Sequence, residues 1–282
     1  MDLVRSDIHL LRGRSSRLCL TGVLSGLLLF LSPPAAVSDS GRGVLPRGSA
    51  YMGVGVRAHE RGAAWSEDRS LAPRGTHTEG VDVSSHQRNV AWTTLWNAGT
   101  RWAYTKATEG TYYQNPYFAQ QYNGPYSAGM VRGSYHFATP DTTSGKAQAD
   151  YFVDHGGGWS ADGRTLPGVL DIEWNPYGAS CYGKSKSGMV SWIRDFLNRY
   201  KARTGRHAVL YTATAWWNEC TGNYSGFGAS PLWIARYASS AGTLPAGWSS
   251  YTMWQYTSTG RTVGDHDKFN GSTTKLRSFA AG

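Results

Sequence analysis

Two carboxylates lie two residues apart in the run Leu170-Asp171-Ile172-Glu173, which its apolar neighbours predict to be a buried strand. Successive strand side chains point to opposite faces, so Asp171 and Glu173 share one face, with roughly 6–7 Å between their Cβ atoms. Burial and mutual repulsion raise the pKa of at least one such acid. A carboxyl group that stays protonated near neutral pH can act as a general acid beside an ionised neighbour. The plainer alternative is a pair of exposed acids at a strand end, hydrogen-bonded to backbone.

Three further polar residues lie within or just after predicted strands: Asp82 in 79–83, Glu109 after 102–107, and His136 in 133–138. Each also has an ordinary structural explanation. An Asp near a strand end often accepts hydrogen bonds from a turn, an acid in a loop is often exposed, and a single strand histidine is often a hydrogen-bonded core residue. The sequence therefore leaves both roles open for each of the three.

Asp265 and Asp267 flank His266 close to the last predicted strand, 251–256. This cluster has the residue types of a metal site, but it lacks the regularly spaced oxygen ligands of a calcium-binding loop. We therefore expect no metal here, and we treat the two aspartates as further acids near a strand end.

The elements that must position these acids alternate between strand-like and helix-like segments. Strands are predicted at 79–83, 102–107, 133–138, 169–173, 207–211, 231–237 and 251–256, with helices at 92–96, 116–122, 146–153 and 189–200. The last of these helices has one apolar stripe at helical spacing and ends before Gly205. Repeated strand–helix units predict an α/β fold with a parallel sheet, and about eight strands would close it into a small TIM-like barrel. In such barrels the chemistry gathers at the C-terminal strand ends, where these acids lie.

The N-terminal part has the composition of a targeting segment. Residues 1–38 predict a secretory signal peptide, because several arginines precede an apolar run at about 18–31 and then small residues. That run is too short to span a bilayer, so we expect a secreted protein with no membrane segment in its mature form. Residues 39–78, rich in Gly, Arg, Ser and Ala without periodicity, predict a flexible leader. Residues 79–282 are long enough for one sizeable domain.

Two cysteines remain once Cys19 is removed with the signal peptide. Cys181 and Cys220 have no other Cys or His at metal-ligand spacing, and an oxidising destination favours a disulfide between them. Closing a loop of this length stabilises a fold by roughly 3–4 kcal/mol in the chain-entropy model. We interpret the pair as structural.

The chain has a formal net charge of +9 and is rich in tryptophan. A basic exported protein suits an anionic partner such as a bacterial wall, whereas no Lys/Arg stripe or recognition motif indicates nucleic-acid binding. Aromatic side chains near strand ends can stack on sugar rings, although core packing explains any one of them at least as well. The stacking candidates are Tyr135, Trp174, Tyr211, Trp217 and Trp254, and the candidates for hydrogen bonds to a substrate are Arg236 and Gln255.

Four motifs in order carry a resemblance to a known family. They are Gly-Val-Asp-Val-Ser-Ser-His-Gln at 80–87, Lys-Ala-Thr-Glu-Gly at 106–110, Tyr-His-Phe at 135–137 and Leu-Asp-Ile-Glu at 170–173. Together they resemble glycoside hydrolase family 25, the N-acetylmuramidases of the Chalaropsis and Streptomyces type, over essentially all of 79–282. The resemblance implies a flattened barrel of eight strands and about five helices, in a lysozyme that needs no metal or cofactor. Its substrate would be peptidoglycan, in which it would hydrolyse the β-1,4 bond between N-acetylmuramic acid and N-acetylglucosamine.

The resemblance also implies roles for individual residues. Glu173 matches the proton donor, Asp171 the carboxylate that orients the 2-acetamido group of the substrate, and Asp82 a further active-site acid. The last acid of the family precedes a Phe by four residues, which selects Asp265 over Asp267. The expected substrate pocket consists of Glu109, Tyr135, His136, Tyr211, Trp217, Arg236, Trp254 and Gln255.

The implied mechanism is retaining and substrate-assisted: Glu173 protonates the leaving oxygen, and the acetamido oxygen of the substrate attacks the anomeric carbon. A direct carboxylate nucleophile stays open. Two other functions also stay open, namely a wall-glycan binding module that does not cut and a glycosidase for another N-acetylated polymer such as chitin. The presence of both strand-end acids favours an enzyme. Nothing in the sequence indicates an obligate oligomer, so we expect a monomer.

Overall fold

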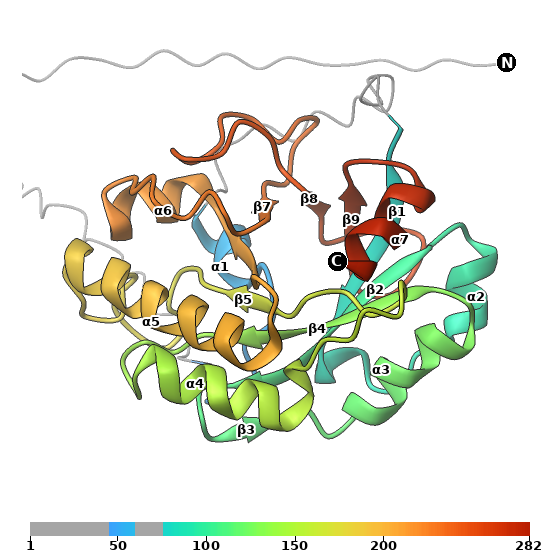
Figure 1. Ribbon diagram of the computed structural model, residues 1–282, viewed down its shortest axis with the longest axis horizontal. Coiled ribbons are helices and arrows are strands. Elements are labelled where there is room, and N and C mark those ends of the chain that lie inside the picture. Colours follow the sequence, from blue (N-terminus) through green and yellow to red (C-terminus); the bar gives the residue numbers. More distant parts are fainter. Residues whose placement is uncertain (1–44, 60–75) are drawn as a thin grey trace, which may run out of the picture. The chain divides into compact units, whose positions relative to one another are not determined.

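A closed barrel of eight strands forms the centre of the protein, as the alternating strands and helices predicted (Figure 1). The computed structural model describes residues 45–59 and 76–282. The strands of the ring are β1 Thr78–Val83, β2 Trp102–Glu109, β4 Val131–Phe137, β5 Val169–Asp171, β6 Val209–Thr212, β7 Leu232–Ala235, β8 Met253–Thr257 and β9 Asp265–Phe269. They follow one another around the ring in this order, and β1 pairs with β2 and β9 to close it. The short strand β3, Tyr113–Gln114, pairs with β2 outside the ring.

The sheet is mixed, whereas repeated strand–helix units predicted a parallel one. The neighbours from β1 through β8 are parallel, but β9 is antiparallel to both β8 and β1. The sequence did not predict β9, because its buried positions hold Asp265 and Asp267 with only Phe269 as an apolar residue. A strand with an acidic buried face lacks the apolar alternation by which strands are recognised.

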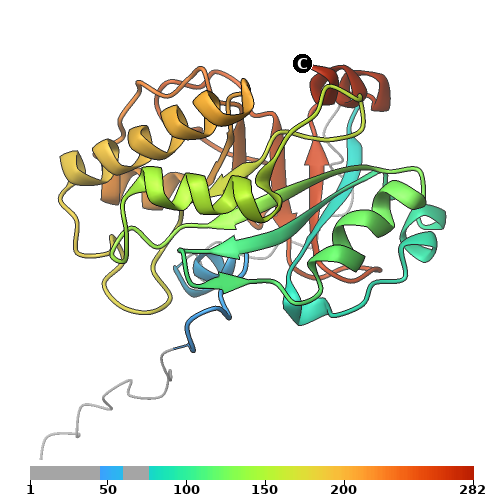
Figure 2. The same ribbon diagram turned by 60° about the horizontal axis from the view of Figure 1, so that its bottom comes forward.

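Helices pack against the outside of the barrel (Figures 1 and 2). They are α2 Trp92–Asn97, α3 Phe118–Ser127, α4 Gly145–Phe152, α5 Lys186–Thr204, α6 Thr214–Thr221 and α7 Thr273–Ala281. With α1, Val54–His59, the described residues contain seven α-helices where about five were expected. In α5 the predicted apolar stripe is buried, the Ser185 hydroxyl caps the first turn, and Gly205 ends the helix at φ +75°.

Aromatic side chains fill the barrel interior. Trp102 on β2 and Trp233 on β7 lie with ring centroids 5.6 Å apart, and Tyr104 lies 5.0 Å from Trp233. All three are fully buried. Gly80 on β1 makes room for them, because a Cβ atom there would lie 2.1 Å from the Trp102 ring. The interior is therefore a packed core and not a channel, as in other barrels of this size.

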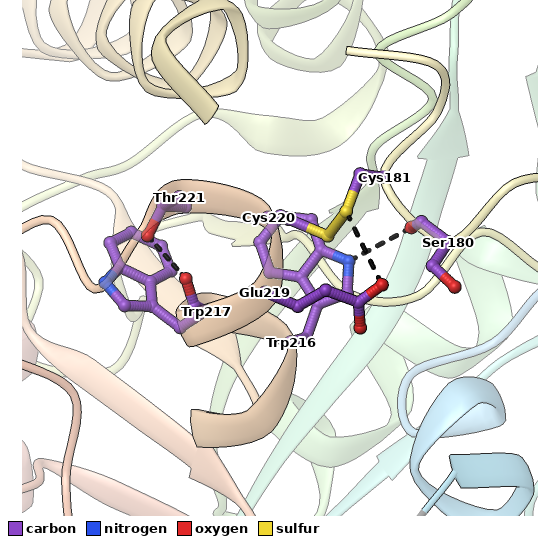
Figure 3. Close-up of a disulfide and its surroundings, with 7 residues drawn as sticks. All are labelled: Ser180, Cys181, Trp216, Trp217, Glu219, Cys220 and Thr221. Carbon is purple, nitrogen blue, oxygen red and sulfur yellow. Dashed lines mark hydrogen bonds between the residues drawn. A yellow bond between two sulfur atoms is a disulfide. The ribbon is translucent and has the colours of Figure 1, made fainter. Parts of the chain in front are cut away.

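The predicted disulfide joins Cys181 to Cys220, with 5.3 Å between the Cα atoms (Figure 3). Cys181 lies in the loop after β5, and Cys220 lies near the end of α6. Beside the disulfide, the Trp216 indole N–H donates to the carbonyl of Ser180 at 3.2 Å. The crosslink thus fixes the loop that follows β5 against α6, and the interpretation of the pair as structural is confirmed.

The predicted signal peptide, residues 1–38, lies outside the described residues. Within the described ranges, no helix is both long and apolar enough to cross a membrane. Part of the predicted leader does have a described structure, because residues 45–59 include α1 and contact the barrel. The proposed domain boundary near residue 79 stays a prediction.

Candidate active site

Acidic side chains gather at the C-terminal ends of the barrel strands. Glu109 and Asp171 are the last residues of β2 and β5, Glu173 follows two residues after β5, and Asp82 is the penultimate residue of β1. Because β9 runs in the opposite direction, its first residue, Asp265, reaches the same end. The topology therefore brings together acids that lie far apart in the sequence.

A glutamine connects two of these acids. Asp82 and Asp265 are direct partners across the β1–β9 pair. Nε2 of Gln255 on β8 donates to Oδ2 of Asp82 at 2.8 Å and to Oδ2 of Asp265 at 3.3 Å. Oε1 of Gln255 accepts from the hydroxyl groups of Tyr211 at 2.7 Å and Tyr237 at 3.1 Å. This network fixes the orientation of both carboxylates.

Asp267 lies on the same face of β9 but deeper. It is fully buried, whereas Asp265 is 9% exposed. Neither oxygen of Asp267 has a hydrogen-bond partner of good geometry among the described residues, although Asp82 and Trp233 lie close enough to influence its pKa. Burial, and then the charge of Asp82, raise the pKa of Asp267 well above its usual range. Burial, and then the charge of Asp265, do the same for the pKa of Asp82.

Asp171 is fully buried at the end of β5. Neither of its carboxylate oxygens has a hydrogen-bond partner among the described residues. Burial raises its pKa well above the usual range, and the charges of Glu173 and Asp82 add to this effect. A buried acceptor without a partner is costly, so Asp171 has the environment expected of a carboxyl group that meets a donor on a ligand.

Glu173 is fully buried as well, and both of its oxygens have partners. Oε1 accepts from the backbone N–H of Gly53 at 2.7 Å, and Oε2 accepts from that of Gly55 at 2.8 Å. Burial raises the pKa of Glu173 to about 8, against the opposing effect of these hydrogen bonds. A carboxyl group that holds its proton near neutral pH can serve as a general acid.

A β-bulge in β2 brings Lys106 and Glu109 to one face. The register with β4 shifts between Lys106 and Thr108, so Ala107 is an extra residue. Residues three apart in a regular strand would point to opposite faces. Nζ of Lys106 lies 2.6 Å from Oε2 of Glu109, and both side chains are fully buried. Sequence reasoning identified Glu109 but not this ion pair, because the bulge is not visible in the strand pattern.

Three of the predicted aromatic residues lie beside the acids. Tyr211 reaches Gln255, the Tyr135 hydroxyl accepts from a backbone N–H at 3.4 Å, and Trp174 directly follows Glu173. The structure adds Tyr237, which reaches Oδ2 of Asp265 at 3.3 Å. Tyr177 is a further addition, and its hydroxyl donates to Oε1 of Glu109 at 2.6 Å. Tyr237 is the last residue of the predicted strand 231–237, so its position at a strand end could have identified it as a site residue.

His136 and Trp254 point away from the acids. His136 contacts Gln148 of α4 at 2.9 Å and the hydroxyl of Thr108 at 2.8 Å, and burial lowers its pKa to about 4. Trp254 belongs to a separate apolar cluster beneath the loop after β7. Strand alternation explains both positions. Tyr135 precedes His136 and Gln255 follows Trp254, and because both of these neighbours point inward, His136 and Trp254 point outward. The structure therefore supports the plainer explanation of His136 as a neutral core histidine.

Trp217 and Arg236 also lie outside the acid cluster. Trp217 is buried in α6, where its ring packs edge-on against Phe227 and Trp248. The guanidinium of Arg236 donates to the carbonyl of Ser240 at 3.4 Å in the loop after β7. Neither residue contacts an acid of the site, so the structure gives no support for a role in substrate binding.

The described residues contain one group of three potential metal ligands with their ligand atoms within 4.8 Å of one another. It consists of Cys181, Glu219 and Cys220. Both cysteines are in the disulfide, so their sulfur atoms are not thiolate ligands.

Comparison with known proteins assigns most of the barrel to one family. The model of "Glycosyl hydrolases family 25" matches residues 81–265. "Lysozyme M1" of Streptomyces globisporus is 48% identical over 282 residues, which cover 95% of this chain and 96% of that protein. The "N,O-diacetylmuramidase" of Chalaropsis sp is 49% identical over 192 residues, which cover 66% of this chain and 91% of that protein.

Solved structures agree with this assignment. The bacterial lysozyme from Streptomyces coelicolor is 51% identical and superposes with a TM-score of 0.71, covering 73% of this chain and 98% of its own. The muramidase from Acremonium alcalophilum is also 51% identical with a TM-score of 0.71, covering 72% of this chain and 98% of its own. The shared part corresponds in length to the barrel.

Proposed function

This chain belongs to glycosyl hydrolases family 25 and is a lysozyme, a glycosidase with N-acetylmuramidase activity, and we propose that Glu173 and Asp171 carry out its reaction. The substrate is peptidoglycan, and the bond cleaved joins N-acetylmuramic acid to N-acetylglucosamine. The observation that carries the proposal is the pair of buried carboxyl groups at the end of β5, within range of the charge of Asp82.

Glu173 acts as the general acid. Its raised pKa favours the protonated form, which the leaving glycosidic oxygen requires. In the first step the proton moves from Glu173 to that oxygen as the bond to the anomeric carbon breaks. In the second step the ionised Glu173 accepts a proton from the attacking water. One residue thus serves as acid and then as base, as retention of configuration requires.

Asp171 orients the 2-acetamido group of the muramic acid. Its unpartnered oxygens offer an acceptor for the N–H of that group, which directs the acetamido oxygen toward the anomeric carbon. The new carbon–oxygen bond forms as the glycosidic bond breaks, and water reopens the resulting ring in the second step. No carboxylate nucleophile is needed.

Asp82 and Asp265 complete the acid cluster. Their shared hydrogen bonds to Gln255 hold them at the open end of the barrel, where they stabilise positive charge developing on the sugar ring. Glu109, Tyr135 and Tyr211 lie at the same strand ends, and the proposal is that they form, with the acids, the cleft that contacts the glycan once it is uncovered. The proposal also includes export through residues 1–38 and a monomeric enzyme.

The experiment is product analysis on purified peptidoglycan with wild type and Glu173→Gln. New reducing ends are reduced with borohydride and identified by mass spectrometry, with digestion long enough that a slow rate does not hide the product. Muramitol ends from wild type alone are expected, with the Glu173→Gln rate lower by about 10²–10⁴-fold. The exposed Glu219→Gln is the matched control and should retain the wild-type rate. Glucosaminitol ends would instead assign the other glycosidic bond.

A further inference from the structure

The N-terminal segment, residues 45–59, lies across the open end of the barrel (Figure 2). Ala50, Met52 and Val56 are at most 1% exposed, and the last two belong to the main hydrophobic core. A leader without a binding site would leave such side chains in water. These three side chains are therefore buried like those of the barrel core.

Glu173 is the first anchor of this segment. Both of its carboxylate oxygens accept backbone N–H groups of the segment, from Gly53 and Gly55. These hydrogen bonds favour the ionised form of Glu173 and direct both oxygens toward the segment, so neither oxygen faces a glycosidic oxygen while the segment is bound. The backbone at Gly53–Gly55 also fills the space next to Glu173 that the sugar must enter.

The Lys106–Glu109 ion pair is the second anchor. The N–H of Gly48 donates to Oε1 of Glu109 at 2.9 Å, and Nζ of Lys106 donates to the carbonyls of Gly48 at 3.1 Å and Ala50 at 2.5 Å. The N–H of Ala50 donates to the hydroxyl of Tyr177 at 3.0 Å. Backbone groups of the segment thus satisfy buried polar groups of the cleft.

Aromatic and charged contacts extend this interface in both directions. Arg47 forms an ion pair with Asp141 at 2.8 Å. At the other end, the ring of His59 stacks on Trp174 with centroids 4.7 Å apart and planes 3° apart. Trp174 has the flat apolar face on which a sugar ring would stack, and the segment covers it.

The fit depends on two glycines. A Cβ atom at Gly53, where φ is +85°, would lie 2.2 Å from the hydroxyl of Tyr237 and 2.6 Å from Oε1 of Gln255. A Cβ atom at Gly55 would lie 2.7 Å from Oε2 of Glu173 and 2.8 Å from Cβ of Trp174. The close approach of backbone to the acids therefore requires glycine at both positions.

We propose that the N-terminal segment is an autoinhibitory pro-segment: attached to the barrel it fills the glycan cleft, and its removal by proteolysis releases the active lysozyme. This inference rests on the proposed function, because it assigns a regulator to the same site. A covalent tether gives the segment a high effective concentration, so hydrolysis of one peptide bond by an external protease weakens inhibition without changing any contact.

The first test uses the full chain with the recognition sequence of a site-specific protease inserted after Pro73. Initial rates of muramitol-end formation are compared before cleavage and after cleavage followed by removal of the peptide. We expect the rate to rise on the order of 10²-fold. Equal rates in the two forms would overturn the autoinhibition alone, whereas muramitol ends from neither form would overturn the proposed function and the inhibition with it.

The second test has a readout other than activity. A synthetic peptide of residues 45–59 is titrated into the cleaved protein by calorimetry, and its effect on kinetics is measured. Binding with a raised KM and an unchanged kcat is expected, because the peptide and the glycan occupy the same cleft. A peptide that does not bind, or that lowers kcat with KM unchanged, contradicts the proposal.

A glycine variant tests the fit in the uncleaved chain. Gly53→Ala with Gly55→Ala should raise the rate of the intact chain toward that of the cleaved form, because the segment can no longer seat against Glu173 and Tyr237. The matched control is Gly158→Ala, where an added Cβ atom meets nothing within 4 Å and φ is −64°. An intact double variant that is as slow as wild type, yet folded by circular dichroism, would contradict the proposed fit.

Discussion

Asp82 and Asp265 are direct partners on neighbouring antiparallel strands, and one glutamine amide donates to both carboxylates. Two acids at this spacing repel each other when ionised, and burial adds to the cost. The shared Gln255 amide and the Tyr237 hydroxyl, which reaches Asp265, offset part of it. Such an arrangement lowers the free energy of unfolding, so stability does not explain it. It indicates that the negative charge has a function at the open end of the barrel.

The two aspartates of β9 should therefore differ in their effect on catalysis. We expect Asp265→Asn to lower kcat by about 10²-fold, because Asp265 lies at the open end and shares the hydrogen bonds of Asp82. Asp267→Asn should have a much smaller effect, since Asp267 lies deeper, near Trp233. Steady-state kinetics of the two cleaved variants on peptidoglycan decides this. A larger loss in Asp267→Asn would make Asp267 the last active-site acid.

Much of the barrel and its acid site could be predicted because two simple rules apply to them. Apolar alternation identifies most strands, and barrel topology places residues at the C-terminal strand ends together. Asp171 and Glu173 satisfy both rules, since they follow an apolar strand at a spacing of two. The same alternation also explains the wrong assignments. His136 follows the inward-pointing Tyr135, so its side chain lies on the opposite face of the strand and not in the site.

The structural features that the sequence did not reveal do not follow those two rules. The buried face of β9 carries Asp265 and Asp267, so a hydrophobic pattern cannot mark it. The bulge at Ala107 turns Lys106 toward Glu109, against the period of a regular strand. Residues 45–59 bind the cleft mainly through backbone groups and glycines, which leave no periodic signal and were interpreted as a flexible leader.

The pH dependence of catalysis should follow the protonation of Glu173. Burial raises its pKa from 4.5 to about 8, and the acids facing it, above all Asp265, also favour the protonated form. Removing the N-terminal segment reduces the burial, which lowers the pKa, and removes the Gly53 and Gly55 hydrogen bonds, which raises it. We therefore expect kcat of the cleaved enzyme to fall as pH rises from 4.5 to above 8. The sign follows because the acid must be protonated to act. A kcat that stays constant across this range would assign the proton to another group.

Removing the disulfide should cost stability and leave the chemistry intact. Cys181 and Cys220 are 39 residues apart, so the serine double variant should lose roughly 3–4 kcal/mol of unfolding free energy. Urea denaturation checks this, and reduced wild type serves as the control because it should unfold at the same urea concentration as the variant. An unchanged midpoint would mean that α6 and the loop after β5 hold together without the crosslink.

Asp267→Asn should stabilise the intact chain at neutral pH. The pKa of Asp267 in the fold is raised well above 3.8, so the folded state binds this proton more tightly than the unfolded state does. The contribution of Asp267 to the free energy of unfolding is complete below pH 3.8, the unfolded pKa, and is lost as pH rises to the folded pKa. The loss is about 1.4 kcal/mol for each pH unit between these two pKa values. The variant lacks this loss, so its advantage over wild type in unfolding free energy should grow between pH 4 and pH 7, as measured by urea denaturation at each pH. The matched control is Asp162→Asn, because backbone hydrogen bonds from Arg164 and Thr165 outweigh the effect of burial and lower the pKa of Asp162 below 3.8. The stability that Asp162 contributes is complete above pH 3.8 and is lost only at lower pH, so the difference in unfolding free energy between this variant and wild type should stay nearly constant from pH 4 to pH 7. An Asp267→Asn advantage that does not change with pH would show that Asp267 keeps an ordinary pKa in the fold.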